Sequence, residues 1–100
     1  ALFRASPVKR TGRDRFVRNV LIAIGNAAGA VTPSQQSQYL TAIESRLIDT
    51  SPLVQGMAVW ALGQYLSDSE MKIRAASALS DEAAGQEMDD TVRVEWEFWL

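Results

Sequence analysis

The sequence predicts an all-α protein built as a short helical repeat, and three observations lead to this prediction. Helix-start signals, in which a Ser, Thr or Asp stands just before a proline or an acidic residue, recur along the chain without strand-like alternation. The chain of 100 residues has the length of one domain, and 47% hydrophobic with 22% charged residues is typical of globular proteins. Three apolar segments also share one pattern at a fixed spacing.

The first predicted helix runs from Thr11 to about residues 25–29. The second begins after Thr32, because Thr32 can cap it, Pro33 suits the first helical position and Gln35 completes a capping-box pattern. The apolar residues of this second helix are Tyr39, Leu40, Ile43 and Leu47. Their helical spacing predicts that they face the core.

Two further helix starts follow in the middle of the chain. Ser51 and Pro52 repeat the cap-and-proline signal and open a third helix that ends near Leu66. Ser67 caps a fourth helix, whose end within residues 80–86 the pattern leaves open. The apolar side of this fourth helix is formed by Met71, Ala75, Ala78 and Leu79.

The fifth predicted helix begins at Asp89 and Asp90, and it completes a pattern that repeats every 38 residues. In each copy, one helical face carries apolar residues at positions i, i+4, i+7 and i+8. The copies are Phe16, Val20, Ala23 and Ile24; Val54, Ala58, Ala61 and Leu62; and Val92, Trp96, Trp99 and Leu100. This period is typical of HEAT-type hairpins, which bury one another. We therefore expect a short right-handed HEAT-like solenoid of about five helices, with Trp60, Trp96 and Trp99 in its core.

A concentrated basic segment opens the chain. Residues 1–43 carry a net charge of +5 and residues 44–100 a net charge of −7, although the whole chain carries only −2. The cations of this segment, which are candidate nucleic-acid contacts, are Arg4, Lys9, Arg10, Arg13, Arg15 and Arg18. Guanidinium groups bind phosphate oxygens through two hydrogen bonds, so the segment suits a nucleic-acid backbone. We expect residues 1–12 to form a basic arm or linker and residues 13–100 to form the helical domain.

The basic segment also has a second interpretation. A solvated arm, or an arm paired with the acidic half of its own or another molecule, explains the same charges. No aromatic residue of the segment is available to stack on a base, because Phe16 is assigned to the apolar face, so the pattern specifies phosphate and not base sequence. Both interpretations stay open on the residues alone.

The sequence offers no residues for common catalytic or metal chemistry. Cysteine and histidine are absent, which removes thiolate nucleophiles, iron–sulfur ligands and the commonest general base. No glycine-rich phosphate loop occurs, and helix capping explains the acidic residues Glu87, Asp89 and Asp90 better than a cation site does. The most apolar run, residues 20–31, is too short for a bilayer, so a soluble protein is expected. Its expected location is the cytoplasm.

Three stretches resemble the C-terminal part of bacterial epoxyqueuosine reductases: SPVKRTGRDRFVRNVLIAIGN, DTSPLVQGMAVWALG and DDTVRVEW. The resemblance implies a HEAT-like C-terminal region that helps to hold a tRNA. The full-length family enzyme reduces the epoxide of epoxyqueuosine at the wobble base of certain tRNAs. It uses cobalamin and two four-iron–four-sulfur clusters, held by an N-terminal catalytic domain and a ferredoxin-like domain. The resemblance thus implies a fragment that is not an enzyme by itself and binds neither cofactor.

The resemblance also suggests residue roles. The expected RNA-backbone contacts are Lys9, Arg10, Arg13 and Arg18, with Arg4 and Arg15 as support. Gly12 is expected to let the chain turn between arm and helix, and Asn19 to fix the local backbone. Gln55 stands where the family often has a basic residue, which weakens the case for phosphate contacts by the second hairpin. The alternative function is a HEAT-like scaffold that docks a partner helix or its own parent domain.

Overall fold

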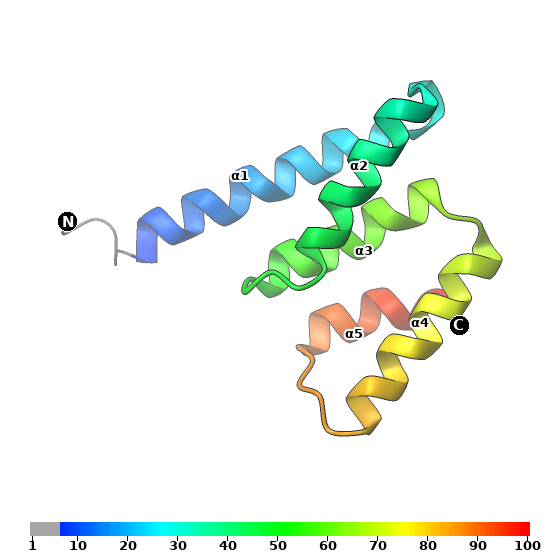
Figure 1. Cartoon of the computed structure of the whole chain (residues 1–100). Helices are drawn as coiled ribbons and strands as arrows, with labels where there is room; N and C mark the ends of the chain where they lie inside the picture. Colours follow the sequence, from blue (N-terminus) through cyan, green and yellow to red (C-terminus); the bar gives the residue numbers. More distant parts are fainter. Residues whose placement is uncertain (1–6) are drawn as a thin grey trace.

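The computed structural model describes the backbone of residues 7–100 and the side chains of residues 12–100. This part of the chain is all-helical, as predicted (Figure 1). Its elements are α1 (Pro7–Asn26), the short 3₁₀ helix η2 (Ala28–Ala30), α2 (Pro33–Arg46), α3 (Pro52–Tyr65), α4 (Asp68–Ala83) and α5 (Asp90–Glu97). Residues 1–6, and with them Arg4, lie outside the described part.

The predicted N-caps of α2 to α5 are confirmed. The Gln35 N–H donates to the Thr32 hydroxyl at 3.2 Å, and the Gln35 side chain accepts from the Thr32 N–H at 3.0 Å, which forms the capping box. An equivalent box closes the start of α4 at Ser67. The Ser51 hydroxyl caps α3, and the Asp89 carboxylate accepts from the N–H of Thr91 at 2.9 Å at the start of α5. These caps set where each helix begins.

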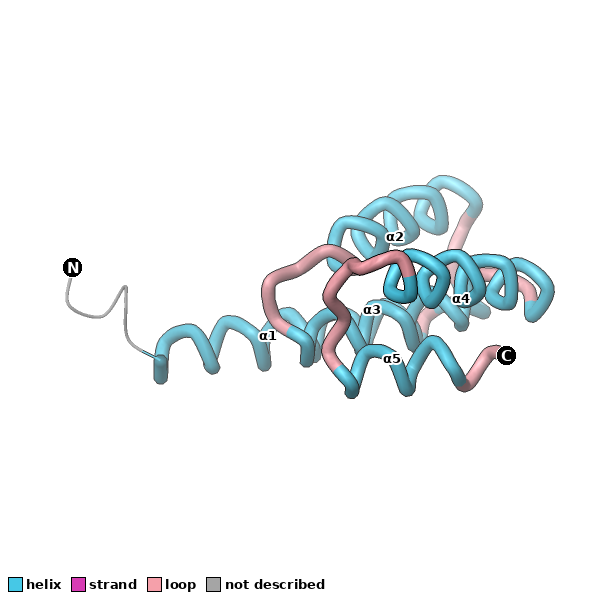
Figure 2. Tube along the Cα trace, turned by 90° about the horizontal axis from the view of Figure 1, so that it is seen from below, coloured by secondary structure: helices cyan, strands magenta, loops and turns pink. Residues whose placement is uncertain are grey.

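The helices form two layers. Helices α1, α3 and α5 lie side by side in chain order, and α2 and α4 form the second layer, with α2 packed on α3 and α4 on α5 (Figure 2). The described part is correspondingly thin along one axis, with extents of 46 × 37 × 17 Å. This arrangement is compatible with the predicted solenoid, whose repeat nature and handedness stay a prediction.

The core lies between the layers and is centred on α3. Its buried residues are Leu21, Ile43, Val54, Ala58, Val59, Ala61, Leu62, Met71, Ala75, Val92 and Trp96. Trp60 and Trp99 are half-buried and pack against this cluster, so Trp96 alone of the three is fully in the core. The predicted core faces of α2 and α4 are confirmed at Ile43, Met71 and Ala75.

The same close contact occurs twice at the predicted spacing of 38 residues. Gly25 of α1 lies against the indole ring of Trp60, and Gly63 of α3 lies against the indole ring of Trp99. A Cβ atom at either glycine would overlap the ring. Glycine is therefore favoured at both positions, because any larger residue would push against the ring unless the ring moved.

Helix α1 differs from its prediction in three respects. It begins at Pro7 and not at the predicted Thr11, while the division into a basic arm of residues 1–12 and a domain of residues 13–100 stays a prediction. Gly12 lies within this helix, and the turn predicted there is wrong. Phe16 and Val20 were predicted to face the core, yet 69% and 42% of their surfaces are exposed.

The physical reason is the choice of packing face. Helix α1 contacts the core through Val17, Leu21 and Ile24. Of the predicted stripe, Ile24 is therefore confirmed, while Ala23 is exposed like Phe16 and Val20. Among the described helices, α3 is the one with which α1 packs extensively, so the described residues cover only part of its apolar surface. At the other end of the chain, Leu100 is 67% exposed and lies with Trp99 beyond the end of α5, contrary to the predicted core position of Leu100.

Candidate nucleic-acid interface

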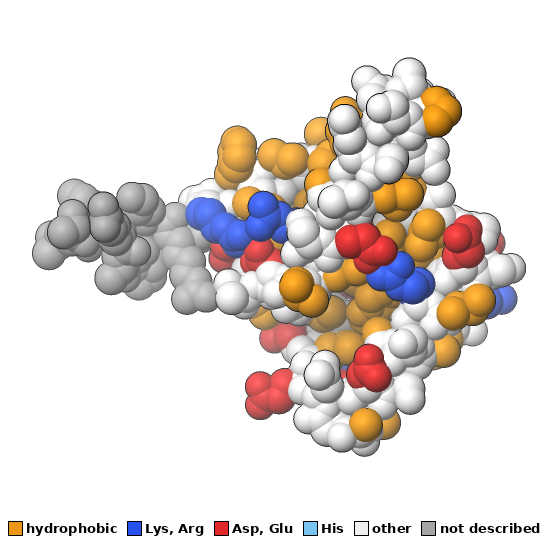
Figure 3. Space-filling model, in the orientation of Figure 1, with side chains coloured by type: hydrophobic (Ala, Val, Ile, Leu, Met, Phe, Trp, Pro, Cys, Tyr) orange, Lys and Arg blue, Asp and Glu red, His pale blue; other side chains and the backbone are white. Residues whose placement is uncertain are grey.

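The predicted phosphate-contacting residues lie within residues 9–18 of α1, apart from Arg4, which precedes the helix in the sequence. Arg13, Arg15 and Arg18 lie on α1 with described side chains. Lys9 and Arg10 lie on the same helix, but their side chains lie outside the described residues. Figure 3 shows basic side chains gathered over this end of α1, next to acidic ones. Whether these cations contact RNA stays a prediction.

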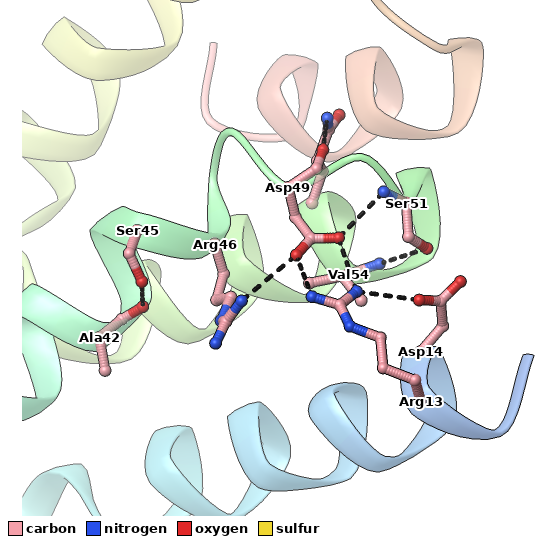
Figure 4. A network of polar contacts seen from close by, with 9 residues as sticks. Arg13, Asp14, Ala42, Ser45, Arg46, Asp49, Ser51 and Val54 are labelled. Atoms are coloured by element: carbon pink, nitrogen blue, oxygen red, sulfur yellow. Dashed lines mark hydrogen bonds and ion pairs between the residues drawn. The ribbon is translucent and has the colours of Figure 1, made fainter. Parts of the chain in front are cut away.

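Arg13 is engaged by carboxylates of the same molecule (Figure 4). Its two terminal nitrogens donate to both oxygens of Asp49, at 2.9 and 2.7 Å, and one of them also donates to Asp14 at 2.9 Å. This two-bond geometry is the strong form of an arginine–carboxylate pair. It ties α1 to the loop between α2 and α3.

Asp49 is the centre of this network. Its side chain is only 4% exposed, and it accepts further hydrogen bonds from the Ser51 N–H at 3.0 Å and from Arg46 at 3.4 Å. The hydrogen bonds from Arg13 lower the pKa of the Asp49 carboxyl from 3.8 to about 2, and the Ser51 N–H adds to this effect, while burial opposes it. Asp49 therefore stays ionised throughout the neutral range and holds Arg13 in place.

The pair makes stability depend on pH in a defined direction. Because the pKa of Asp49 in the folded state lies below its ordinary value, the stabilisation is fully present above about pH 4 and is lost as the pH falls toward 2. We expect Asp49→Asn to lower the urea midpoint by about 0.5 M at pH 6. At pH 2 the variant and the unsubstituted chain should unfold at nearly the same urea concentration.

A double-mutant cycle with Arg13→Gln is the control. Coupling between the two substitutions is expected at pH 6 and should disappear at pH 2. Equal urea midpoints for the unsubstituted chain and Asp49→Asn at pH 6 would contradict the proposed strength of this ion pair.

Arg15 and Arg18 differ from Arg13. Neither forms an ion pair with any carboxylate among the residues whose side chains are described. Arg15 is exposed, whereas Arg18 is half-buried and donates to the Asn19 side-chain oxygen at 3.3 Å. The Nε of Arg18 is buried, and within the described part it has no hydrogen-bond partner. Since no described carboxylate holds either group, Arg15 and the terminal nitrogens of Arg18 retain donors for an anion, whereas the buried Nε of Arg18 is closed to solvent.

Most other described arginines are paired within the chain. Arg74 of α4 donates to Glu44 of α2, and Arg93 of α5 donates to Glu82 and Asp90. Consequently, the positive charge not balanced by a described ion pair is concentrated on α1, with exposed Lys72 of α4 as a separate case.

Sequence reasoning missed Asp49 and Arg46 as partners of the basic segment. A local signal was present, because Asp49 stands two residues before Ser51 and accepts from its backbone N–H, as an Asx turn does. The sequence contains no comparable signal for the distant partner, Arg13, which lies 36 residues away. Asn19, predicted to fix the backbone, instead accepts from Arg18 and is exposed.

A shallow apolar groove lies across the first layer. It encloses about 660 Å³ between α1, α3 and α5. Its lining comprises Ile22, Asn26, Pro52, Leu53, Gly56, Met57, Trp60, Thr91 and Glu95. The groove offers one acidic and no basic side chain, so its walls are unsuited to a phosphate backbone.

No described helix has the length and apolar character that a bilayer crossing requires. Within residues 12–100, no three potential metal ligands come together.

The chain is similar to two curated proteins, both named epoxyqueuosine reductase. It is 40% identical over 60 residues to the protein from Xanthomonas campestris pv. campestris and 37% identical over 59 residues to that from Alicycliphilus denitrificans. This chain resembles the C-terminal region of epoxyqueuosine reductases. The matches cover 60% and 58% of this chain but only 15% and 16% of the two relatives. No family model and no solved structure matches it significantly.

Proposed function

We propose that this chain is the tRNA-binding C-terminal region of an epoxyqueuosine reductase. The similarity to two proteins of that name supports the parent enzyme. The concentration of unbalanced cations on α1 supports the RNA contact, since phosphate binding requires donors that are not already paired within the protein. The single observation that carries the proposal is the availability of the Arg15 and Arg18 guanidinium groups on the same helix.

The network around Asp49 refines the assignment of roles. Arg15 and Arg18, together with Lys9, Arg10 and Arg4, are proposed to contact the RNA backbone. Arg13 is proposed to act mainly as a positioning residue, because Asp49 already holds its two terminal nitrogens. By fixing α1 to the loop between α2 and α3, it would orient the other cations toward one polyanion.

The catalytic chemistry belongs to the remainder of the proposed parent. An iron–sulfur cluster needs cysteine thiolates, and these 100 residues contain none, so they do not fit such a cluster. We propose that the clusters and the cobalamin are bound by the preceding domains of the full-length protein, and that the enzyme acts in the cytoplasm. The present region would contribute to tRNA binding and not to reduction.

Charge reversal on α1 tests the proposed RNA contact. If about four cations neutralise phosphates, the logarithm of the tRNA association constant should fall with the logarithm of the salt concentration with a slope of about −3 to −4. Arg15→Glu/Arg18→Glu is expected to weaken binding by about tenfold or more at low salt and to reduce the slope by about two. Binding is measured by fluorescence anisotropy with labelled tRNA across a salt series.

Lys72→Glu is the matched control for the single reversal Arg15→Glu, which should weaken tRNA binding in the same direction as the double variant. Lys72 is an exposed cation on α4 without a described ion pair, and its reversal changes the net charge as much as Arg15→Glu does. The control should bind tRNA nearly as tightly as the unsubstituted chain does. Equal losses for Lys72→Glu and Arg15→Glu, or binding insensitive to salt, would refute a localised interface. An effect of the α1 reversals on a protein complex alone would favour the scaffold function.

A further inference from the structure

The apolar surface of helix α1 is only partly covered by the residues that the structure describes. Val17, Leu21 and Ile24 pack against the core. Phe16 and Val20 flank this stripe, in line with Ile24 at four-residue spacing, and are 69% and 42% exposed. Figure 3 shows hydrophobic side chains along the edge of α1 away from α3. Two large apolar residues one helical turn apart form a surface that water solvates poorly.

The repeat indicates what normally covers Phe16 and Val20. The residues 38 positions after Phe16 and Val20 are Val54 and Ala58 of α3, and both are 0% exposed. The next equivalents in α5 are Val92 and Trp96, which are 4% and 6% exposed.

The first-layer helices differ in whether a second-layer helix covers them. Helix α3 packs on α2 and α5 packs on α4, whereas no described second-layer helix packs extensively on α1. Among the described residues, the exposed stripe of α1 is therefore not covered by a second-layer helix, unlike the equivalent faces of α3 and α5.

We propose that a helix preceding residue 1 in the full-length protein docks on Phe16 and Val20 and completes the first hairpin. The similarity to the two epoxyqueuosine reductases supports a preceding helix as the docking partner. The matched segments lie in the C-terminal region of these relatives and make up only 15% and 16% of their length. Most of each relative therefore precedes the matched region. The docking helix is amphipathic, with aliphatic residues at helical spacing on the side that faces α1.

A segment of the same polypeptide fits this surface better than a second copy does. Two exposed side chains offer much less than the roughly 800 Å² per partner that stable dimers bury. A tethered helix avoids most of the entropic cost of association, so a small apolar contact suffices to hold it. This inference does not depend on RNA binding.

Photo-crosslinking in the full-length protein identifies the occupant directly. Phe16 is replaced by p-benzoylphenylalanine, and the crosslinked peptide is identified by mass spectrometry. We expect most of the product to join residue 16 to a peptide that precedes residue 1. Ile73 on α4 is the matched control, because it is also 69% exposed, and its replacement should give at most about one tenth of that product.

Three outcomes of the crosslinking experiment would refute the docking proposal. A crosslink from residue 16 to residues 12–100, a crosslink to a second copy, or no crosslinked peptide would each overturn the proposal. Phe16→Ser/Val20→Ser should also speed amide exchange in α1 of the full-length protein by about tenfold or more, with α5 unchanged. Arg15→Glu/Arg18→Glu should lose tRNA affinity and keep the crosslink, so failure of the RNA proposal is distinguishable from failure of the docking proposal.

Discussion

Trp96→Ala is expected to lower the free energy of unfolding by about 3–5 kcal/mol, the usual range for truncation of a buried aromatic residue. Trp96 is 6% exposed and belongs to the core cluster, although α5 itself spans only residues 90–97. A helix this short has little stability of its own, so its place on α3 depends on burial of its apolar face. Because a domain is stable by about 5–15 kcal/mol in total, the substitution removes a large part of the stability.

Urea denaturation followed by circular dichroism measures this loss. Val94→Ala on the same helix is the control, since Val94 is 61% exposed and its truncation should change the free energy of unfolding by no more than about 0.5 kcal/mol. A loss below about 1 kcal/mol for Trp96→Ala would mean that α5 contributes little to the cooperative unit.

The parts of the fold that follow from local chemistry could be predicted. Thr32, Ser51, Ser67 and Asp89 cap helices because their side-chain oxygens satisfy backbone N–H groups a few residues away. Such signals require no knowledge of distant residues. The buried face of α3 could also be predicted from the sequence. Its apolar residues Val54, Ala58, Ala61 and Leu62 follow at helical spacing, and α3 has neighbours on several sides that bury them.

The parts that depend on the surroundings could not be predicted. Phe16 and Val20 have the same pattern as their buried equivalents in α3, and only the presence or absence of a covering helix separates the two cases. The candidate site shows the same limit. From the sequence, Arg13 is predicted to contact RNA like the other cations of the segment. Only the fold brings Asp49, 36 residues away in the sequence, into contact with it. For Arg15 and Arg18, which have no such carboxylate partner among the described residues, the RNA contact suggested by the sequence stays a proposal.

Gly25→Ala is expected to destabilise the protein by about 1–3 kcal/mol, the usual cost of inserting a group into a closely packed contact. An added Cβ would overlap the Trp60 ring, and Trp60 is anchored within α3. Alanine favours a helix over glycine by about 1 kcal/mol, so the steric cost has to exceed that gain for the net effect to be a loss. The measurement is the free energy of unfolding in urea.

Gly63→Ala and Gly12→Ala separate these two opposing effects. At Gly63 the overlapping ring belongs to Trp99, which lies beyond the end of α5 and can withdraw more cheaply, so a smaller loss than at Gly25 is expected. At Gly12 no atom of the described residues outside the local helix lies within 4 Å of an added Cβ, so alanine there should stabilise α1 by up to about 1 kcal/mol. A neutral or stabilising effect at Gly25 would show that the Trp60 ring moves freely. The approach of α1 to α3 would then depend on Val17, Leu21 and Ile24 and not on the glycine.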